Sequence, residues 1–128
     1  MKIEHAAYQV KDAVGMAGWY SEHLGFITKR GREKPFPVYF LADETGKVMI
    51  EIYTNPAVDV PDYPSMDPLI LHLAFVCPDV PRMVECLKEA GAKLVSGIDT
   101  LENGDVLAMM RDPWGFAIQL CYRREPMI

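Results

Sequence analysis

Four side chains that can bind a metal ion stand in short, otherwise apolar segments of the chain. In the segment 47–54, apolar side chains alternate with a set that includes Glu51, as expected for a β-strand. Gln119 occupies the same kind of position in a later segment, and His5 and His72 stand in two further apolar runs. Two imidazoles, one carboxylate and one amide oxygen form a mixed nitrogen and oxygen set. Such a set suits Zn²⁺, Ni²⁺, Co²⁺, Mn²⁺ or Fe²⁺ and leaves room for water or substrate.

An internal repeat relates these side chains in pairs. Residues 5–20 and residues 72–87 match at a constant offset that aligns His5 with His72. At an offset one residue longer, Glu51 aligns with Gln119. Two half-sites related in this way would bring all four side chains to one centre. We therefore interpret His5, Glu51, His72 and Gln119 as the ligands of a single divalent metal ion.

Each repeat contains a predicted helix. Asp12 and Asp79 stand immediately before the helices, where a short carboxylate can accept the free N–H groups of the first turn. Gly25 and Gly91 stand where the helices are expected to end. Apolar residues at i, i+3, i+4 and i+7 predict one buried face on each helix. These faces consist of Ala13, Met16, Ala17 and Tyr20 in the first helix, and Val80, Met83, Val84 and Leu87 in the second.

The remaining apolar runs predict strands in the same order in both halves. Each half has one strand before its helix, at 3–10 and 69–77, and three after it. The later strands are predicted at 26–30, 36–42 and 47–54 in the first half, and at 92–97, 105–111 and 116–122 in the second. The turns Asp43–Gly46 and Asp112–Gly115 precede the last strands. Each half therefore reads β-α-β-β-β.

The domain organisation follows from these elements. We predict one domain over 1–128, made of module 1 (1–54), a linker (55–68) and module 2 (69–124). The linker contains four prolines, a density that suits an extended connection.

Composition excludes several classes of protein. The 128 residues carry a formal net charge of −5, whereas nucleic-acid binders usually have a basic surplus. No apolar run approaches the roughly 18 residues of a membrane span. The start of the chain, with Lys2, Glu4 and His5, does not resemble a signal peptide. Three cysteines without a CxxC motif suggest reduced thiols. We expect a cytoplasmic protein that binds a small molecule, and neither nucleic acid nor membrane.

The chain resembles the vicinal-oxygen-chelate superfamily over nearly its whole length. The family includes glyoxalase I, methylmalonyl-CoA epimerase, extradiol dioxygenases, fosfomycin-resistance enzymes and bleomycin-binding proteins. The order and spacing of five segments carry the resemblance: Ile3–Val10, Trp19–Phe26, Ile50–Tyr53, Leu71–Phe75 and Arg111–Leu120. The resemblance implies an α+β fold in which two βαβββ modules form a cupped mixed sheet around one metal ion, often in a homodimer.

Bacterial glyoxalase I resembles this chain at His5, Glu51 and His72 and departs from it at Gln119. The family usually has Glu at that fourth position, and in glyoxalase I this Glu moves the proton. The resemblance implies a divalent-metal-dependent lyase or isomerase that chelates vicinal oxygens of a small substrate and stabilises an enolate. We hypothesise that Glu51, or metal-bound hydroxide, takes the proton. With Glu51 as the single carboxylate, the site is formally +1, which favours an anionic ligand.

Two other functions and several substrate contacts stay open at this level. One alternative is a metal-free small-molecule or antibiotic-binding module of the bleomycin-resistance type, and another is an Fe(II)-dependent dioxygenase. Arg30 and Arg32 stand in a basic stretch that could bind a carboxylate or phosphate, although a solvated loop has the same composition. Other candidates for substrate contact, which ordinary packing would equally explain, are Tyr39, Met109 and Trp114.

Overall fold

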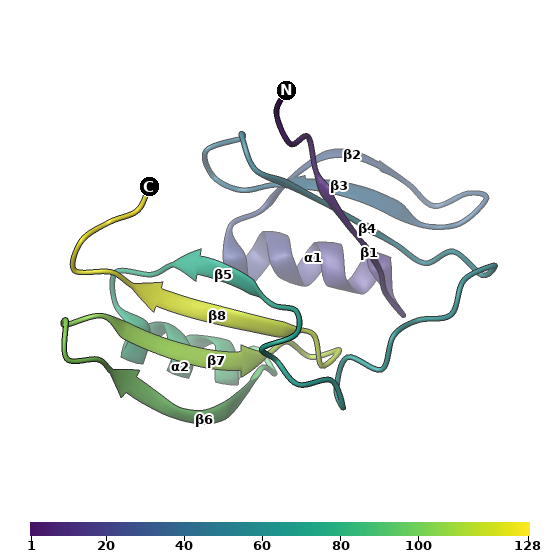
Figure 1. Ribbon diagram of the computed structural model, residues 1–128. Coiled ribbons are helices and arrows are strands. Elements are labelled where there is room, and N and C mark those ends of the chain that lie inside the picture. Colours follow the sequence, from purple (N-terminus) through teal and green to yellow (C-terminus); the bar gives the residue numbers. More distant parts are fainter. The chain divides into compact units, whose positions relative to one another are not determined.

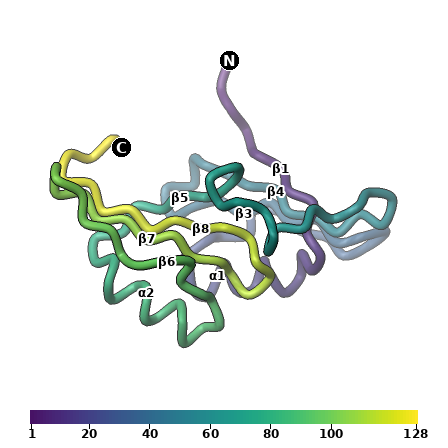
Figure 2. Tube along the Cα trace, turned by 60° about the horizontal axis from the view of Figure 1, so that its bottom comes forward, coloured from purple at the N-terminus to yellow at the C-terminus, as the bar shows by residue number.

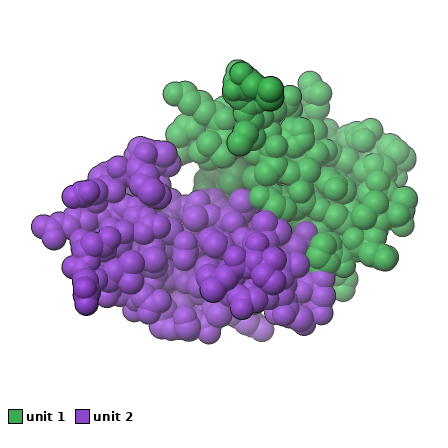
Figure 3. Space-filling model, viewed as in Figure 1, with its two compact units in different colours: residues 1–61 green, residues 62–128 purple.

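The computed structural model describes residues 1–128 and divides them into two compact units. Unit 1 is Met1–Pro61 and unit 2 is Asp62–Ile128 (Figure 3). Each unit contains one four-stranded mixed sheet and one helix in the order β-α-β-β-β. The structure therefore confirms the predicted α+β fold with its two βαβββ modules.

In unit 1 the strand order of the sheet is β1-β4-β3-β2, and α1 packs against β2, β3 and β4 (Figure 1). β1 runs parallel to β4, and the other pairs are antiparallel. The elements are β1 (Ala6–Gln9), α1 (Ala13–Leu24), β2 (Ile27–Arg32), β3 (Val38–Ala42) and β4 (Met49–Tyr53). The sheet thus has one face under the helix and one helix-free face.

Unit 2 repeats this topology with the strand order β5-β8-β7-β6, and α2 packs against β6, β7 and β8 (Figure 2). β5 runs parallel to β8, as β1 does to β4. The elements are β5 (Leu73–Val76), α2 (Val80–Glu89), β6 (Lys93–Thr100), β7 (Val106–Arg111) and β8 (Ala117–Tyr122). No helix of either unit has the length and apolar character that a membrane crossing requires.

Both helices begin at the predicted aspartates. Asp12 Oδ1 accepts a hydrogen bond from the backbone N–H of Gly15 over 2.9 Å, and Asp79 Oδ1 accepts one from Arg82 over 3.1 Å. Gly25 ends α1 in the left-handed conformation, with φ +73°. α2 ends one residue before the predicted glycine, at Ala90, and Gly91 follows with φ +95°.

The predicted helix faces make up much of the core. All four residues of the α1 face are buried, and in α2 only Met83 of the predicted four is partly exposed. In unit 1 the buried face of α1 packs over β4, where Ile50 and Ile52 are 3% and 0% exposed. Because side chains alternate along a strand, Glu51 between these isoleucines belongs to the helix-free face.

The first strand of each module is shorter than predicted. The ladder between β1 and β4 begins at Ala6, and the ladder between β5 and β8 begins at Leu73. His5 and His72 therefore each stand one residue before their strand rather than inside it. Both modules show the same displacement, so the equivalence of the two histidines is preserved.

The proline-rich segment 55–68 is not uniformly extended, because its second half packs on unit 2. The Arg111 guanidinium donates hydrogen bonds to the carbonyl oxygens of Tyr63 (2.7 Å), Met66 (2.6 Å) and Gly115 (2.9 Å). The Tyr63 ring stacks edge-on against Phe116, with a centroid separation of 4.8 Å. These contacts order the residues that lead into His72.

Candidate metal-binding half-sites

His5 and Glu51 lie side by side on the helix-free side of unit 1. The Nε2 atom of His5 is 3.4 Å from Oε2 of Glu51, and their side chains are 30% and 20% exposed. The register accounts for this closeness, because Ala7 pairs with Glu51 and the histidine stands two residues before Ala7. The His5 ring also meets Phe40 of β3 edge-on, at a centroid separation of 5.3 Å.

The other ring nitrogen of His5 is already occupied. Nδ1 lies 3.0 Å from Oε1 of Glu4, and an ionised carboxylate only accepts hydrogen bonds, so Nδ1 carries the hydrogen. In the neutral imidazole this leaves a lone pair on Nε2, the atom that lies near Glu51. A lone-pair nitrogen and a carboxylate oxygen at this distance offer two donor atoms to one metal ion.

The geometry of this pair fits a shared divalent ion. Metal–nitrogen and metal–oxygen bonds are each about 2.1 Å long, so two ligands of a tetrahedral ion are about 3.4 Å apart. The observed separation of Nε2 and Oε2 is 3.4 Å. The carboxylate next to Nδ1 is the outer partner that metal-bound histidines usually have. The His5 and Glu51 side chains are thus suited to hold such an ion.

Unit 2 carries the equivalent half-site with the same register. Ala74 pairs with Gln119, just as Ala7 pairs with Glu51 in unit 1. His72 Nδ1 lies 2.9 Å from the carbonyl oxygen of Pro68, which can only accept, so Nε2 again keeps the lone pair. Both histidines are therefore held through Nδ1 by an oxygen acceptor.

Gln119 is held by a thiol. Cys121 Sγ donates a hydrogen bond to Gln119 Oε1 over 3.3 Å, and burial raises the pKa of this thiol, which favours its protonated, donating form. The bond indicates that Oε1, the ligand-capable atom of the amide, is on the helix-free side together with Cys121. Neither unit gathers three His, Cys, Asp or Glu side chains at one place.

The residues predicted to contact a substrate in unit 1 lie on both faces of its sheet. Arg30 and Arg32 of β2 pair with Phe40 and Val38, which places both arginines on the same face as Glu51. Tyr39 lies between those two partners and pairs with the buried Ile52, so it belongs to the face under α1. A substrate at Glu51 would be on the other side of the sheet. The structure therefore separates Tyr39 from the candidate site.

In unit 2, Met109 pairs with Gln119 and shares its helix-free face. Trp114 stands in the turn between β7 and β8, where its backbone N–H donates to Oδ1 of Asp112 over 3.0 Å. Sequence reasoning overlooked Glu4 and Phe40, both of which contact His5. For Glu4 a signal was present, since a carboxylate directly precedes the histidine.

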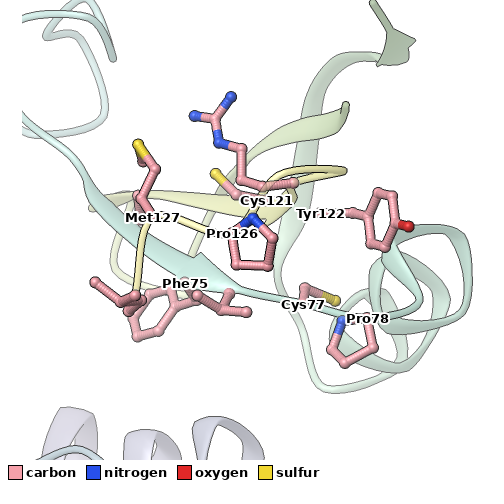
Figure 4. A pocket seen from close by; sticks show the side chains of 11 residues that line it. Phe75, Cys77, Pro78, Cys121, Tyr122, Pro126 and Met127 are labelled. Atoms are coloured by element: carbon pink, nitrogen blue, oxygen red, sulfur yellow. The ribbon is translucent and has the colours of Figure 1, made fainter. Parts of the chain in front are cut away.

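Unit 2 also contains an apolar cavity of about 310 Å³ beside the edge strand β5 (Figure 4). Met127 and Pro126 of the C-terminal segment line it together with Tyr122 of β8. An ion pair anchors this segment: Arg123 Nη1 lies 2.8 Å from Oδ2 of Asp105, and the guanidinium holds the pKa of that carboxyl below its usual range. The lining residues are Ala74, Phe75, Val76, Cys77, Pro78, Cys121, Tyr122, Arg123, Pro126, Met127 and Ile128.

Residues 2–120 match the model of the Glyoxalase/Bleomycin resistance protein/Dioxygenase superfamily. The match spans most of the chain, and the chain belongs to this superfamily. Its members include enzymes such as glyoxalase I. No match was found among curated proteins.

Solved structures with the same fold include both enzymes and binding proteins. Glyoxalase I from Zea mays is 27% identical to this chain, with a TM-score of 0.76. The match covers 97% of our chain but 45% of the maize enzyme, so our chain spans less than half of that enzyme. A glyoxalase family protein from Bacillus cereus is 19% identical, with a TM-score of 0.78, and 95% of our chain covers 93% of it. TnmS3, an antibiotic-binding protein from Streptomyces sp. CB03234, is 19% identical, with a TM-score of 0.68, and 94% of our chain covers 93% of it.

Proposed function

We propose that this protein is a divalent-metal-dependent lyase or isomerase of the glyoxalase I type that acts on vicinal oxygens of a small substrate. One observation carries the proposal: His5 Nε2 and Glu51 Oε2 are 3.4 Å apart, with Nδ1 of the same ring occupied by Glu4. In unit 2, His72 and Gln119 stand at the equivalent ladder positions, and His72 is likewise held through Nδ1. In the proposal, the two half-sites bind one Zn²⁺, Ni²⁺, Co²⁺, Mn²⁺ or Fe²⁺ ion.

The chain's own residues have separate roles in this proposal. When bound, the ion would supply Lewis-acid polarisation of the substrate's two adjacent oxygens. His5 and His72 would hold it through Nε2, each oriented by its Nδ1 hydrogen bond. Glu51 would bind through Oε2 and accept at Oε1 the proton lost from the carbon next to a carbonyl. Gln119 would contribute a neutral oxygen and no base.

The comparisons support this class of activity without naming a substrate. The superfamily includes glyoxalases and dioxygenases, and 97% of the chain aligns with maize glyoxalase I at 27% identity. Glu51 is the single carboxylate of the proposed ligand set. A divalent site with one carboxylate carries a formal charge of +1, which favours anionic substrates.

A metal-free binding module is the second candidate, and the apolar cavity of unit 2 favours it. A volume of about 310 Å³ with aromatic, proline and methionine lining suits an apolar small molecule. TnmS3, which shares the fold, is an antibiotic-binding protein. In this alternative, the close contact of His5 and Glu51 would serve the structure of unit 1 and hold no metal ion.

We also propose a homodimer in the cytoplasm. All three cysteines are free thiols and two of them are buried, which suits a reducing compartment. Size-exclusion chromatography with light scattering measures the oligomeric state directly.

Metal analysis of protein purified without chelator tests the proposed function. We expect one stoichiometric ion. Nickel, cobalt or zinc would favour the lyase or isomerase, iron would favour a dioxygenase, and no metal would favour the binding module. Activity would then be screened with glutathione hemithioacetals, acyl-CoA thioesters and catechols.

The Glu51→Gln variant distinguishes a role of Glu51 in proton transfer from a role in metal binding alone. Removal of a general base typically lowers the rate by about 10²–10⁴-fold, so we expect turnover to fall by that factor while some metal binding remains. Glu44→Gln, in the exposed turn before β4, removes the same charge from the same module and should leave turnover unchanged. Full turnover by the Glu51 variant would refute the assigned role.

A further inference from the structure

The edge strand β2 carries an unusual concentration of positive charge in an acidic protein. Lys29, Arg30, Arg32 and Lys34 stand within six consecutive residues of a chain with net charge −5. Every residue of β2 is exposed. The structure gives Arg30 no hydrogen-bond or ion-pair partner, whereas the Arg32 guanidinium lies over the Phe36 ring at 5.5 Å. Both guanidinium groups thus keep donors for a ligand.

A β-bulge determines which of these side chains face Glu51. Thr28 pairs with Leu41, but Arg30 and not Lys29 pairs with Phe40, so the register shifts at Lys29. Bulges often redirect a side chain in this way beside functional sites. Without the shift, Lys29 would occupy the face of Glu51 and both arginines the face under α1.

Gly31 stabilises this shifted register. It stands opposite Tyr39, and a Cβ at position 31 would lie 2.6 Å from Cδ1 of the tyrosine ring. Only glycine leaves space for that ring. A side chain at position 31 would therefore displace the Tyr39 ring, and a one-residue slip that placed Arg30 or Arg32 opposite Tyr39 would meet the same steric cost.

The register produces one row of side chains across the helix-free face. Glu51 pairs with Phe40, and Phe40 pairs with Arg30. Neighbouring strands are about 4.8 Å apart, so Arg30 is about 10 Å from Glu51 at the level of the backbone. Phe40 lies between the charges and also contacts the ring of His5. The row thus presents the candidate half-site, an aromatic surface and a guanidinium in sequence.

Unit 2 shows that the fold does not require cations at this place. Its edge strand β6 also has a register shift, between Leu94 and Ile98. The residues from Leu94 to Thr100 include no lysine or arginine. The charge on β2 is therefore particular to one module, as a binding function would require.

We propose that Arg30, assisted by Arg32, binds a carboxylate or phosphate group at one end of the substrate while the other end is held at His5 and Glu51. The inference rests on the proposed function and adds the substrate class: an anionic molecule with an apolar, preferably planar, section that crosses Phe40. A guanidinium matches such oxyanions with two parallel hydrogen bonds. The formal +1 charge of the proposed metal site also favours an anionic substrate.

Matched hydroxamates test this arrangement by binding rather than by turnover. Benzohydroxamate chelates a metal through two adjacent oxygens, and 4-carboxybenzohydroxamate and 4-phosphonobenzohydroxamate add an anion across the ring. Their affinities for the Zn²⁺-loaded protein would be measured by calorimetry. We expect at least one anionic ligand to bind about tenfold more tightly than the parent, and the stronger of the two identifies the preferred oxyanion.

Variants assign that difference to individual side chains. Arg30→Gln should abolish the preference for the anionic ligand and leave benzohydroxamate affinity unchanged, and Arg32→Gln should reduce the preference partly. Lys29→Gln removes one positive charge from the same strand. The Lys29 side chain extends toward Gly46, because its Nζ is 3.8 Å from the position that a Cβ on Gly46 would occupy. This control should keep the full preference.

Two results would overturn the inference. Equal binding of all three ligands, or a preference that persists in Arg30→Gln, would refute the anion subsite while leaving the metal-dependent function intact. Failure of every hydroxamate to bind the Zn²⁺-loaded protein would refute the chelating site itself, and the anion subsite with it.

Discussion

At the scale of single residues, the hydrogen bond from His5 to Glu4 has the clearest consequence for binding. Glu4 fixes which nitrogen carries the hydrogen and so leaves Nε2 for Glu51 or for a cation. Outer partners of this kind orient a ligating imidazole and raise its basicity. Glu4 is an exposed residue next to the histidine in sequence, so its effect should be at the small end of the known range.

Glu4→Gln is expected to weaken metal binding without abolishing it. Loss of such a partner typically costs 10–100-fold, and for this exposed carboxylate we expect about tenfold. Competition with a chromophoric chelator measures the affinity. Glu22→Gln is the matched control, because Glu22 stands beside His23 at 3.8 Å in α1, away from the half-site. Equal affinities of the two variants would contradict a role for Glu4.

At the scale of elements, the two edge strands show how backbone irregularities position side chains. β2 and β6 both carry a register shift, but only β2 combines it with a glycine that has no space for a side chain. At Gly97 of β6 a Cβ would meet nothing within 4 Å. The two glycines thus provide a matched pair for testing whether Gly31 supports the register.

Gly31→Ala should destabilise unit 1, whereas Gly97→Ala should not destabilise unit 2. The added methyl group at position 31 would displace the Tyr39 ring, and overpacking of this kind costs about 1–3 kcal/mol. Urea denaturation followed by circular dichroism measures the free energy of unfolding. If both variants were as stable as the natural protein, the steric argument for the β2 register would fail.

At the scale of the whole molecule, the repeat distributes the proposed ligands over both modules. Each unit carries one histidine held through Nδ1 and one oxygen-bearing side chain at the equivalent ladder position. Neither unit by itself provides four ligands. Under the proposed function, an ion held by both half-sites would stabilise the two modules jointly.

Metal addition should raise the melting temperature, and substitution in either module should remove the effect. At a concentration 100 times Kd, binding contributes about 2.7 kcal/mol, which corresponds to a rise of about 10 °C for a chain of this size. We expect no rise for His5→Ala or for His72→Ala, measured by scanning calorimetry with Zn²⁺. His23→Ala is the control. A full rise in the His72 variant would place the ion on unit 1 alone.

Local patterns in the amino-acid sequence determined the two modules and their elements. Helix faces such as Met16 and Tyr20, the capping residues Asp12 and Asp79, and the glycine turns depend on neighbours a few residues away, so periodicity and turn chemistry suffice to predict them. The repeat also indicated that His5 and His72, and Glu51 and Gln119, are equivalent. Their convergence on one ion stays a prediction.

Only the tertiary structure decided which of these side chains meet. The Nε2–Oε2 distance of His5 and Glu51, the face of Tyr39 and the packing of Tyr63 against Phe116 depend on partners far apart in the chain. The bulge at Lys29 moves Arg30 to the face of Glu51, although simple alternation from Thr28 would place it on the other. Register is set by pairing between strands and by steric fit across them, and no pattern within one strand contains that information.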